Sequence, residues 1–579
     1  MKRILALSAA LLVAACSPTS TEPTASTTEA GALPAWTKGA MASAANPHAV
    51  AAAVEVLRKG GHAVDAAIAA HLVLGLVEPQ SSGLGGGAFM LVFARDDADL
   101  IFYDGRETAP AGATVDMFMR DGEVMDFVQA WQSGMAVGVP GVVAMYKSAH
   151  DAHGLLPWAD LFQPAIKLAH DGFEVSPRLA GFLPRIAEYG LLDENPGAAA
   201  YFFPGGEPLQ AGFLRTNPQY ADTLSRIAAQ GIDAFYSGEI ARAMASAAQA
   251  EPDGGSLTTK DIADYRAVTR EAVCGDFRGL SICSTTPPSS GAAQIMIGGL
   301  YDHLAATSAN QADKIAAFVD AQRLAYADRD HFFGDPDAID IPIRELVDPA
   351  YIQYRSTERF APDASPTHGN PHEVLQRKSA VNWGIDTTQE AAGTTHLSII
   401  DLEGNAVSMT ATVEAPFGSS RWVAGFLLNN EMTDFAREAS ADGITVANAI
   451  APGRRPRSSM SPTMVFDADG KLLMITGSAG GNSIPAYVAK TIVGVLDWEM
   501  SAQDAVDFPN IVARGDTVRV EVSADAGKTI AKDLAARGYN VVERDGENSG
   551  LHVIVVRRDG LEGAADKRRE GVVEWLSAH

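Results

Sequence analysis

The chain has 579 residues, 47% of them hydrophobic and 20% charged, a composition typical of globular proteins. The 71 acidic residues outnumber the 45 basic ones, and the resulting net charge of −26 argues against a nucleic-acid partner. The length allows several domains, but two-layer sheet folds of this size also occur as one unit.

Residues 1–16 have the pattern of a targeting segment. Lys2 and Arg3 form a basic start, and residues 4–15 form an apolar run that is too short to span a bilayer as a mature helix. The residues leading into Cys16 are similar to a bacterial lipobox, in which the cysteine is lipidated and becomes the mature N-terminus. The alternative is a plain cleaved signal in which Cys16 has no role.

The residues after this segment indicate where the protein works. Ser17 follows the cysteine, a pattern typical of outer-membrane lipoproteins. We therefore expect a protein of the bacterial periplasm that meets the outer membrane through a lipid anchor only. Residues 17–38, whose first part is rich in Ser, Thr, Pro and Ala, are expected to form a disordered tether.

A glycine-rich run lies between a predicted helix and a predicted strand. Residues 47–77 predict an Ala-rich helical segment with a break at Gly60-Gly61, and residues 89–93 predict a strand. Between them, residues 83–88 fit the G-x-G-x-x-A pattern of dinucleotide-binding loops. That motif requires a strand before it and a helix after it, which is not the order here. The sequence therefore favours close backbone packing at these glycines.

Residues 140–330 predict mixed helices, including 160–170 and 314–330. The acidic cluster from Asp328 to Asp337 lacks the ligand spacing of an EF-hand, so we expect a solvated cluster at a helix end. The sequence implies no metal ion and no organic cofactor.

Two cysteines besides Cys16 flank a turn-rich segment between strand-like runs, at Cys274 and Cys283. An exported protein folds in an oxidising compartment, so a disulfide across this hairpin is one interpretation. Two buried thiols are the other. A metal site is disfavoured because no C-x-x-C motif or histidine cluster accompanies the pair.

The pattern changes from loop to strand near the end of the second third of the chain. Residues 361–393 are polar and predict an exposed loop, and residues 394–412 predict a hairpin with its turn at Glu403. Counting back along both strands from this turn sets Thr394 opposite Thr412, unless a bulge shifts the register.

Two segments together resemble the γ-glutamyltranspeptidase family: residues 393–401, which begin that hairpin, and the hydroxyl-rich loop 455–463. The resemblance extends over residues 39–574, nearly all of the expected mature chain. It implies a precursor that cleaves itself between Gly393 and Thr394 and then uses Thr394 as the nucleophile.

The chemistry of threonine is consistent with that role. A Thr hydroxyl is a poor nucleophile near neutral pH and requires a base. The α-amino group of an N-terminal Thr titrates at about 7.7–8.0 and can serve as that base, whereas an internal Thr has no such amine. Taken alone, Gly393-Thr394 also fits an ordinary strand start.

The resemblance also implies a fold. We expect an α+β, four-layer αββα sandwich of the N-terminal-nucleophile hydrolase type, matured by self-cleavage. Residues 39–393 would form a large chain and residues 394–579 a small chain of the same domain.

Further residues receive roles from the resemblance. Thr412 steadies the nucleophile, and the backbone N–H groups of Gly480 and Gly481 form the oxyanion hole. An arginine, whose planar guanidinium suits a carboxylate, and two serines bind the substrate α-carboxylate, while three acidic residues bind the α-amino group. These substrate-binding residues are Arg106, Ser458, Ser459, Glu414, Glu431 and Asp434.

Each assignment has a structural alternative. Arg106 also fits a surface salt bridge, and the three carboxylates fit solvated loop charges. The two serines fit a capped turn, and the Gly480-Gly481 pair fits a flexible turn.

Two features depart from the family pattern. Residues 436–453 are shorter than the loop that covers the site in several bacterial members and lack its tyrosine, so we expect a site open to larger acceptors or acyl groups. Lys567 stands where the family has proline, which is a surface change.

The implied reaction is γ-glutamyl transfer from glutathione or another γ-glutamyl amide to water or to an amino-acid or peptide acceptor, through an ester on Thr394. One alternative is an amidase or acylase of the same fold that acts on glutaryl side chains. Another is a lipid-anchored binding protein that no longer cleaves itself.

Overall fold

The computed structural model describes residues 36–577 except 191, 194, 378–381, 389 and 442. Cys16 and residues 17–35 of the predicted tether lie outside the described residues. The end of the predicted tether contacts the fold, because the Lys38 ammonium donates hydrogen bonds to the backbone carbonyls of Arg557 and Arg558. No helix in the described part of the chain is long and apolar enough to cross a membrane.

Twelve strands among the described residues form one continuous series, in the order β22-β21-β17-β16-β9-β8-β3-β2-β11-β10-β1-β23. Strand β8 joins two antiparallel sheets, because its first residues pair with β3 and its later residues pair with β9. The strands are β1 (Ala40–Ala44), β2 (Gly87–Ala94), β3 (Asp99–Gly105), β8 (Val268–Phe277), β9 (Leu280–Thr285), β10 (Gly393–Ile400), β11 (Ala406–Glu414), β16 (Thr463–Phe466), β17 (Leu472–Gly477), β21 (His552–Arg557), β22 (Gly560–Ala565) and β23 (Val572–Leu576).

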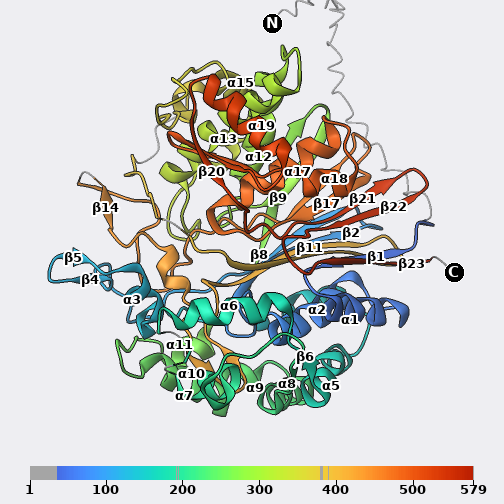
Figure 1. Ribbon diagram of the computed structural model, residues 1–579, viewed down its shortest axis with the longest axis vertical. Helices are drawn as coiled ribbons and strands as arrows, with labels where there is room; N and C mark the ends of the chain where they lie inside the picture. Colours follow the sequence, from blue (N-terminus) through green and yellow to red (C-terminus); the bar gives the residue numbers. More distant parts are fainter. Residues whose placement is uncertain are drawn as a thin grey trace, which may run out of the picture. The chain divides into compact units, whose positions relative to one another are not determined.

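The two sheets face each other and helices cover both outer sides (Figure 1). Side chains bridge the sheets: the Ser398 hydroxyl of β10 donates to the carbonyl of His552 in β21, and that of Ser408 in β11 donates to the carbonyl of Thr476 in β17. One outer layer contains α1 (Pro47–Arg58), α2 (Ala63–Val77), α4 (Val142–His153), α5 (Gln163–Asp171) and α8 (Pro218–Gln230). The other contains α12 (Gly291–Ala305), α13 (Gln311–Phe332), α17 (Ile484–Leu496) and α18 (Ala502–Asp507). The expected αββα sandwich is confirmed.

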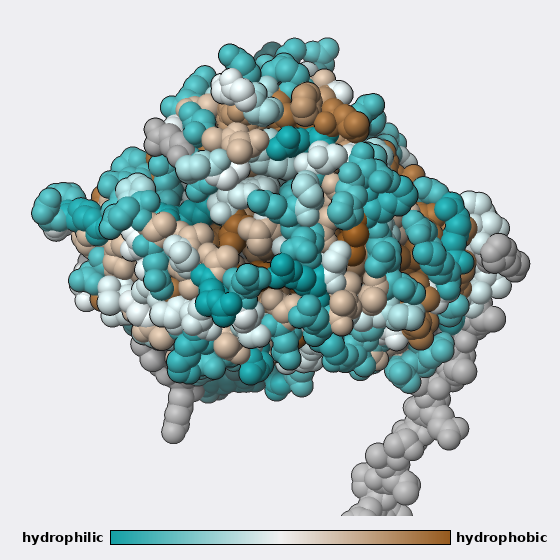
Figure 2. Space-filling view, turned by 90° about the horizontal axis from the view of Figure 1, so that it is seen from below, coloured by the Kyte–Doolittle hydropathy of each residue, from teal (hydrophilic) through white to brown (hydrophobic). Residues whose placement is uncertain are grey.

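Smaller elements surround these layers. The helices are α3 (Phe127–Gln132), α6 (Pro177–Ala187), α7 (Pro196–Phe202), α9 (Asp233–Tyr236), α10 (Gly238–Gln249), α11 (Thr259–Asp264), α14 (Ile343–Leu346), α15 (Pro349–Arg355), α16 (Pro371–Val374) and α19 (Asp525–Ala536). The strands are β4 (Met119–Arg120), β5 (Glu123–Val124), β6 (Phe173–Glu174), β7 (Leu214–Arg215), β12 (Trp422–Val423), β13 (Phe426–Leu427), β14 (Ser440–Ala441), β15 (Ile444–Thr445), β18 (Ile511–Arg514), β19 (Thr517–Glu521) and β20 (Asn540–Arg544). Figure 2 shows the molecule from below the view of Figure 1. This face is mainly hydrophilic, with hydrophobic residues scattered among the polar ones.

The predicted helix 47–77 is two helices, as its Gly60-Gly61 break indicated. The Asn46 side chain caps α1 by accepting a hydrogen bond from the backbone N–H of His48. His62 and Asp65 form a reciprocal capping box at the start of α2. Both helices are buried against the sheet that contains β1, β10 and β11. Their small residues allow this close packing.

The glycine-rich run before β2 packs closely against neighbouring backbone, as predicted. A Cβ atom on Gly85 would lie 2.1 Å from the carbonyl oxygen of Leu427, and one on Gly86 would lie 2.0 Å from that of Thr412. Any side chain here would push apart the segments that hold the β11 strand.

The predicted hairpin forms with the predicted register. The backbone N–H of Asp401 donates to the carbonyl of Asn405 at 3.0 Å, and Thr394 on β10 lies opposite Thr412 on β11. The register shifts only at the start, between Gly393 and Thr394, so the predicted pair is unaffected.

In the acidic cluster at the end of α13, Asp328, Asp330 and Asp335 are buried and Asp337 is exposed, so the expectation of solvated charges is wrong for three of the four aspartates. Asp328 is fully buried and accepts hydrogen bonds from Arg355 (3.0 Å) and from the Tyr351 hydroxyl (2.7 Å). Asp335 accepts from the backbone N–H of Arg455 at 2.9 Å. Later segments supply these donors, the Arg355 guanidinium to Asp328 and the Arg455 backbone to Asp335, which local sequence does not indicate. No group of three or more potential ligands among the described residues is arranged to hold a metal ion.

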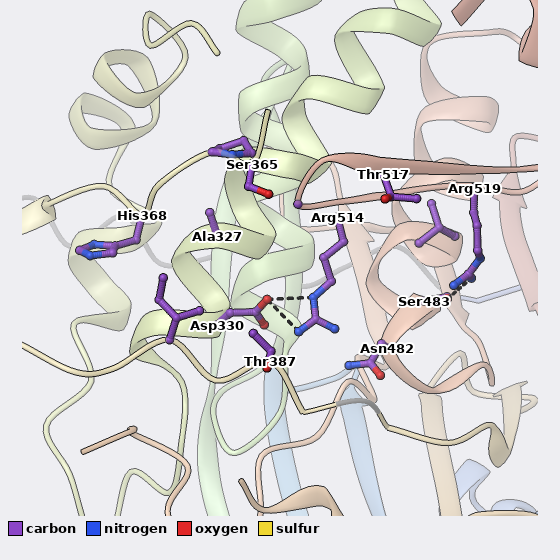
Figure 3. Close-up of a pocket in the computed structure, with 14 residues that line it drawn as sticks. Ala327, Asp330, Ser365, His368, Thr387, Asn482, Ser483, Arg514, Thr517 and Arg519 are labelled. Atoms are coloured by element: carbon purple, nitrogen blue, oxygen red, sulfur yellow. Dashed lines mark hydrogen bonds and ion pairs between the residues drawn. The ribbon is translucent and has the colours of Figure 1, made fainter. Parts of the chain in front are cut away.

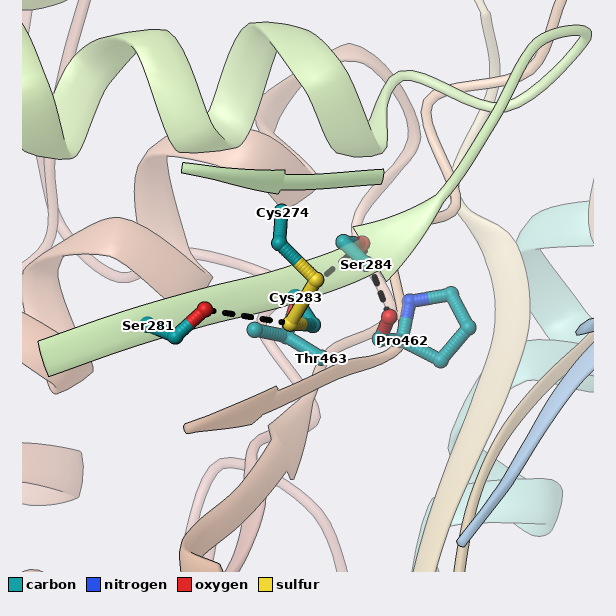
Figure 4. The surroundings of a disulfide bond; sticks show 6 residues. All are labelled: Cys274, Ser281, Cys283, Ser284, Pro462 and Thr463. Atoms are coloured by element: carbon teal, nitrogen blue, oxygen red, sulfur yellow. Dashed lines mark hydrogen bonds between the residues drawn. A yellow bond between two sulfur atoms is a disulfide. The ribbon is translucent and has the colours of Figure 1, made fainter. Parts of the chain in front are cut away.

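Cys274 and Cys283 form a disulfide, which decides between the two interpretations (Figure 4). They lie opposite each other on β8 and β9, where the hairpin brings their Cα atoms to 4.0 Å. The alternative of two buried thiols is wrong.

Candidate active site

Thr394 lies near the start of strand β10, beside the Thr412 hydroxyl that the register predicted. Thr394 and Thr412 are each 3% exposed, and their Oγ1 atoms are 3.3 Å apart. The Thr412 hydroxyl donates to the carbonyl oxygen of Gly393 at 2.9 Å and accepts from the backbone N–H of Glu414 at 2.8 Å. The Thr412 hydroxyl therefore contacts both the candidate nucleophile, Thr394, and the carbonyl of the Gly393–Thr394 bond.

Two groups from the end of the chain hold the backbone on either side of that bond. Arg569 donates from Nη1 to the carbonyl oxygen of Thr394 at 2.7 Å, and the Asn548 side chain donates to the carbonyl of Ala392 at 3.3 Å. Burial, together with the nearby Arg178, lowers the pKa of Arg569 to about 9. Sequence reasoning missed Arg569, although it lies two residues after the noted Lys567.

The Gly480-Gly481 turn lies against the segment that precedes Thr394. Both glycines have positive φ angles, 134° and 54°. A Cβ atom on Gly481 would lie 2.6 Å from the carbonyl oxygens of both Glu390 and Ala391. Gly480, Ala391 and Ala392 line one cavity of about 770 Å³. The turn thus needs glycine for its conformation and for this close approach.

Arg106 does not lie free for a ligand but is bound by two of the predicted acidic residues. Its guanidinium contacts Glu431 and donates to Asp434 at 2.6 Å, and it also donates to the backbone carbonyls of Pro456 and Arg457. Burial opposes the charge of Arg106, but Glu431 and Asp434 outweigh it and raise its pKa. The surface salt bridge and the solvated loop charges, given above as alternatives for Arg106, Glu431 and Asp434, are therefore wrong.

Carboxyl groups outnumber cations around Arg106. Glu107 is fully buried 3.8 Å from the guanidinium, and burial raises its pKa to about 7. Burial also raises the pKa values of Glu414, Glu431 and Asp434, with mutual repulsion adding to the effect. Three carboxyl groups thus contact one guanidinium, and Glu414 lies beside Asp434. Glu107 was missed by sequence reasoning, although it follows Arg106 directly.

Glu414 already has a partner from the segment before the nucleophile. One carboxylate oxygen accepts from the backbone N–H of Ala391 at 2.8 Å, and the other accepts from the Asn430 side chain. The position predicted to bind an α-amino group is therefore occupied by a backbone donor.

The two predicted serines differ in their surroundings. The backbone N–H of Ser459 donates to the Glu390 carboxylate at 2.8 Å, and its hydroxyl accepts from Arg329 at 2.6 Å. The Ser458 hydroxyl instead accepts from the backbone N–H of Met460 at 3.3 Å, within its own loop. Ser459 thus contacts Arg329 and Glu390, whereas the Ser458 hydroxyl is bonded within its own loop.

A buried ion-pair group next to Ser459 was not predicted. Arg329 contacts Glu390, and Arg457 lies 3.1 Å from Asp386. Arg457 lies in the loop 455–463 that carries the family resemblance, directly before Ser458.

A second cavity, of about 470 Å³, is also lined by Asn482 and Ser483 (Figure 3). In it Arg514 pairs with Asp330 at 2.8 Å, and Arg519 donates to the Ser483 hydroxyl at 2.7 Å. Both cavities share Asn482, Ser483 and Arg519.

The segment 436–453 contains the short hairpin β14–β15, with Ser440 opposite Thr445. The backbone N–H of Gly384 donates to the carbonyl of Thr445 at 2.9 Å. This short segment therefore packs against the loop that leads to Thr394.

Comparisons with known proteins agree with this geometry. The family model described as Gamma-glutamyltranspeptidase matches residues 49–576. The chain is 34% identical to the glutathione hydrolase proenzyme of Escherichia coli (strain K12), over 92% of this chain and 91% of that protein. It is 33% identical to the acylase ACY 1 proenzyme of Pseudomonas sp. (strain SE83), over 92% of each. The crystal structure of a cephalosporin acylase from Bacillus halodurans superposes with a TM-score of 0.81 at 25% identity, over 94% of this chain and 97% of that one.

Proposed function

The chain belongs to the gamma-glutamyltranspeptidase family, and from that premise we propose that it cleaves itself before Thr394 and then transfers γ-glutamyl groups from glutathione or related amides. The observation that carries the proposal is the position of the Thr412 hydroxyl, within hydrogen-bond reach of Thr394 and of the carbonyl of Gly393. The acceptor is water, an amino acid or a peptide.

Maturation begins when Thr394 Oγ1 attacks the carbonyl carbon of Gly393. The hydroxyl proton passes to the departing amide nitrogen, the C–N bond breaks, and the acyl group is held as an ester on Thr394. Water then hydrolyses the ester, which leaves a carboxylate on Gly393 and a free amine on Thr394. The hydrogen bond from Thr412 supports this route, because the Gly393 oxygen carries the negative charge in the tetrahedral intermediate.

In the mature enzyme the new amine takes the proton of the Thr394 hydroxyl as Oγ1 attacks the γ-carbonyl carbon of the donor. The donor's amine leaves with that proton and a γ-glutamyl ester remains. Water or an acceptor amine then takes the acyl group. Backbone N–H groups of the Gly480-Gly481 turn stabilise the oxyanion; the shared cavity of Gly480 with the residues before Thr394 supports this role.

The donor assignment follows from charge. Three carboxyl groups contact the Arg106 guanidinium and Glu414 lies beside Asp434, so this cluster is short of positive charge, and a ligand ammonium would favour the ionised carboxylates. A γ-glutamyl amide carries such an ammonium, whereas a glutaryl amide does not. Sites built for a polar group reject analogues that lack it by about 10⁴–10⁵ when the pairing is fully buried, and by less when the site is open.

A donor panel tests the assignment on the matured protein. We expect a higher kcat/KM for γ-glutamyl-p-nitroanilide than for glutaryl-p-nitroanilide. Asp434→Ala should reduce that preference, and Arg106→Ala should weaken both donors because Glu431 and Asp434 lose their counter-ion. Equal turnover of the two donors by wild type would instead favour the acylase. That second function has its own support in the 33% identity to the acylase ACY 1 proenzyme.

We also propose that the protein is anchored in the outer membrane of a bacterial cell through a lipid on Cys16, with the site in the periplasm. The lipobox-like residues before Cys16 support this. Wild type should partition with membranes, and Cys16→Ala should carry no lipid. A mature N-terminal peptide that lacks Cys16 and any lipid, seen by mass spectrometry, would contradict the anchor.

A further inference from the structure

The cavity of about 770 Å³ beside the Gly480-Gly481 turn has the opposite charge to the protein as a whole. Five arginines line it against three acidic residues, which leaves an excess of two positive charges. The whole chain has a net charge of −26. We call this space the arginine cavity, and its charge favours an anionic ligand. The five arginines are Arg178, Arg185, Arg519, Arg544 and Arg568.

Helix α6 forms one part of the wall and presents two of these arginines. Arg178 and Arg185 are seven residues apart on α6 with Phe182 between them, a spacing that puts all three on one face of a helix. The guanidinium carbons of the two arginines lie 5.0 and 5.1 Å from the centre of the Phe182 ring. These cation–π contacts hold both arginines along the wall of the cavity.

Another part of the wall comes from the end of the chain. Arg544 is the last residue of β20, and Glu547 lines the cavity three residues later. Arg519 on β19 donates to Glu547 at 2.8 Å and to the Ser483 hydroxyl at 2.7 Å, which fixes its position. The arginine cavity is thus built from both expected chains, with α6 in the large one and these residues in the small one.

Two of the five arginines have no counter-ion. Among the described residues, neither Arg185 nor Arg544 forms an ion pair, and both are exposed. The other three arginines each lie 2.6–3.8 Å from a carboxylate oxygen. Acidic residues outnumber basic ones in this chain by 71 to 45, so a shortage of carboxylates does not explain the two unpaired guanidinium groups. A carboxylate that belongs to a ligand would pair with them.

The arginine cavity adjoins the bond before the nucleophile but not the residues assigned to the donor's γ-glutamyl group. Gly480, Ala391 and Ala392 line it, and the Asn548 side chain in its wall donates to the carbonyl of Ala392 at 3.3 Å. None of the six predicted substrate-binding residues lines it. A γ-glutamyl amide consists of the γ-glutamyl group and the amine attached to it, so the cavity is placed for the amine part.

We propose that the arginine cavity binds the amine part of the substrate, and that Arg185 and Arg544 select peptides with an acidic side chain. The cavity receives both the peptide that leaves the donor and the acceptor that replaces it, because transfer to an amine is the reverse of acylation. The inference rests on the proposed γ-glutamyl function and names the class of peptide on which that function acts.

The first test compares two donors on matured protein, γ-glutamyl-glycyl-aspartate and γ-glutamyl-glycyl-asparagine, which have nearly the same size and differ by one charge. Chromatography follows the release of each dipeptide. Wild type should prefer the aspartate donor in kcat/KM by about tenfold, as expected for charge-assisted hydrogen bonds weakened by solvent exposure. The preference should decrease as salt is added, because salt screens exposed charges.

Variants of the two unpaired arginines test which residues set this preference. Arg185→Gln and Arg544→Gln should each lower the ratio of the two kcat/KM values by about threefold, and the double variant should bring it within about twofold of equality. Arg185→Lys and Arg544→Lys keep the charge and should keep most of the preference. Arg344→Gln is the matched control, because Arg344 is 89% exposed and does not line the cavity. The ratio is independent of how much of each variant matures.

The acceptor side is tested with γ-glutamyl-p-nitroanilide as the donor and glycyl-aspartate or glycyl-asparagine as the acceptor. Glycyl-aspartate should form its transfer product faster by a similar factor, and equal transfer to the two would overturn the shared cavity. Equal kcat/KM for the two peptide donors, or a ratio that the double Gln variant leaves unchanged, would overturn the selection of acidic peptides while the proposed function stands. Wild type that releases neither dipeptide nor p-nitroaniline contradicts the proposed function itself, and the inference falls with it.

Discussion

Removal of the Thr412 hydroxyl should slow self-cleavage far more than it destabilises the fold. In the intact chain this hydroxyl donates to the Gly393 carbonyl at 2.9 Å, a neutral hydrogen bond worth about 0.5–1.5 kcal/mol. When Thr394 attacks, the same oxygen becomes an oxyanion, and the loss of one donor to such an oxygen costs about 10²–10³ in rate, or about 2.7–4 kcal/mol. Thr412→Ala should therefore lengthen the half-time of maturation by about two to three orders of magnitude.

The assay follows the single chain and its two products on a denaturing gel over time after purification. Thr412→Ser keeps the hydroxyl and should restore most of the rate. Thr395→Val is the matched control, because the Thr395 hydroxyl is one residue away on the same strand and makes no hydrogen bond among the described residues. Wild-type maturation of Thr412→Ala, or equal slowing by Thr395→Val, would refute the reasoning.

Further predictions test other parts of the molecule. Thr394→Ala should remain one inactive chain and Thr394→Ser should cleave slowly, and N-terminal sequencing that finds a small chain starting elsewhere would contradict this. Gly481→Ala should delay cleavage on the same gel, because its Cβ would lie 2.6 Å from two carbonyl oxygens. Burial lowers the pKa of His71 to about 3, so the unfolded chain takes up the proton first as the pH falls below about 6.5. Wild type should then lose about 2 kcal/mol of unfolding free energy between pH 7 and pH 5 that His71→Leu does not lose, measured by urea denaturation. Without reductant, Cys274 and Cys283 should take up no iodoacetamide in the denatured protein, and labelling by mass spectrometry checks this.

Local geometry made part of the site predictable. The turn at Glu403 determines the pairing of the two strands that leave it, so Thr394 and Thr412 could be set opposite each other by counting residues. The close packing of the glycines before β2 also followed from the order of helix, loop and strand.

Pairings across long stretches of sequence were not predictable in the same way. Arg106 and Glu431 are 325 residues apart, and nothing in either neighbourhood indicates that each is the other's counter-ion. The same holds for Asp328 with Arg355, and so the expectation of a solvated charge was wrong for Asp328. Glu390 lies in a polar stretch that predicts only an exposed loop, whereas tertiary packing brings its carboxylate to Arg329. The family resemblance supplied positions for several of these residues but not their partners.

The strand order has a consequence for what a cut at Gly393 can release. Four ladders join strands from opposite sides of that bond: β9 with β16, β2 with β11, β1 with β10, and β1 with β23. Strand β1, from the first part of the chain, lies between two strands of the second. Dilution alone would therefore not separate the two products, since they part only if both sheets come apart. Each product made alone would expose unpaired strand edges, so exchange of one product for a fresh copy requires unfolding.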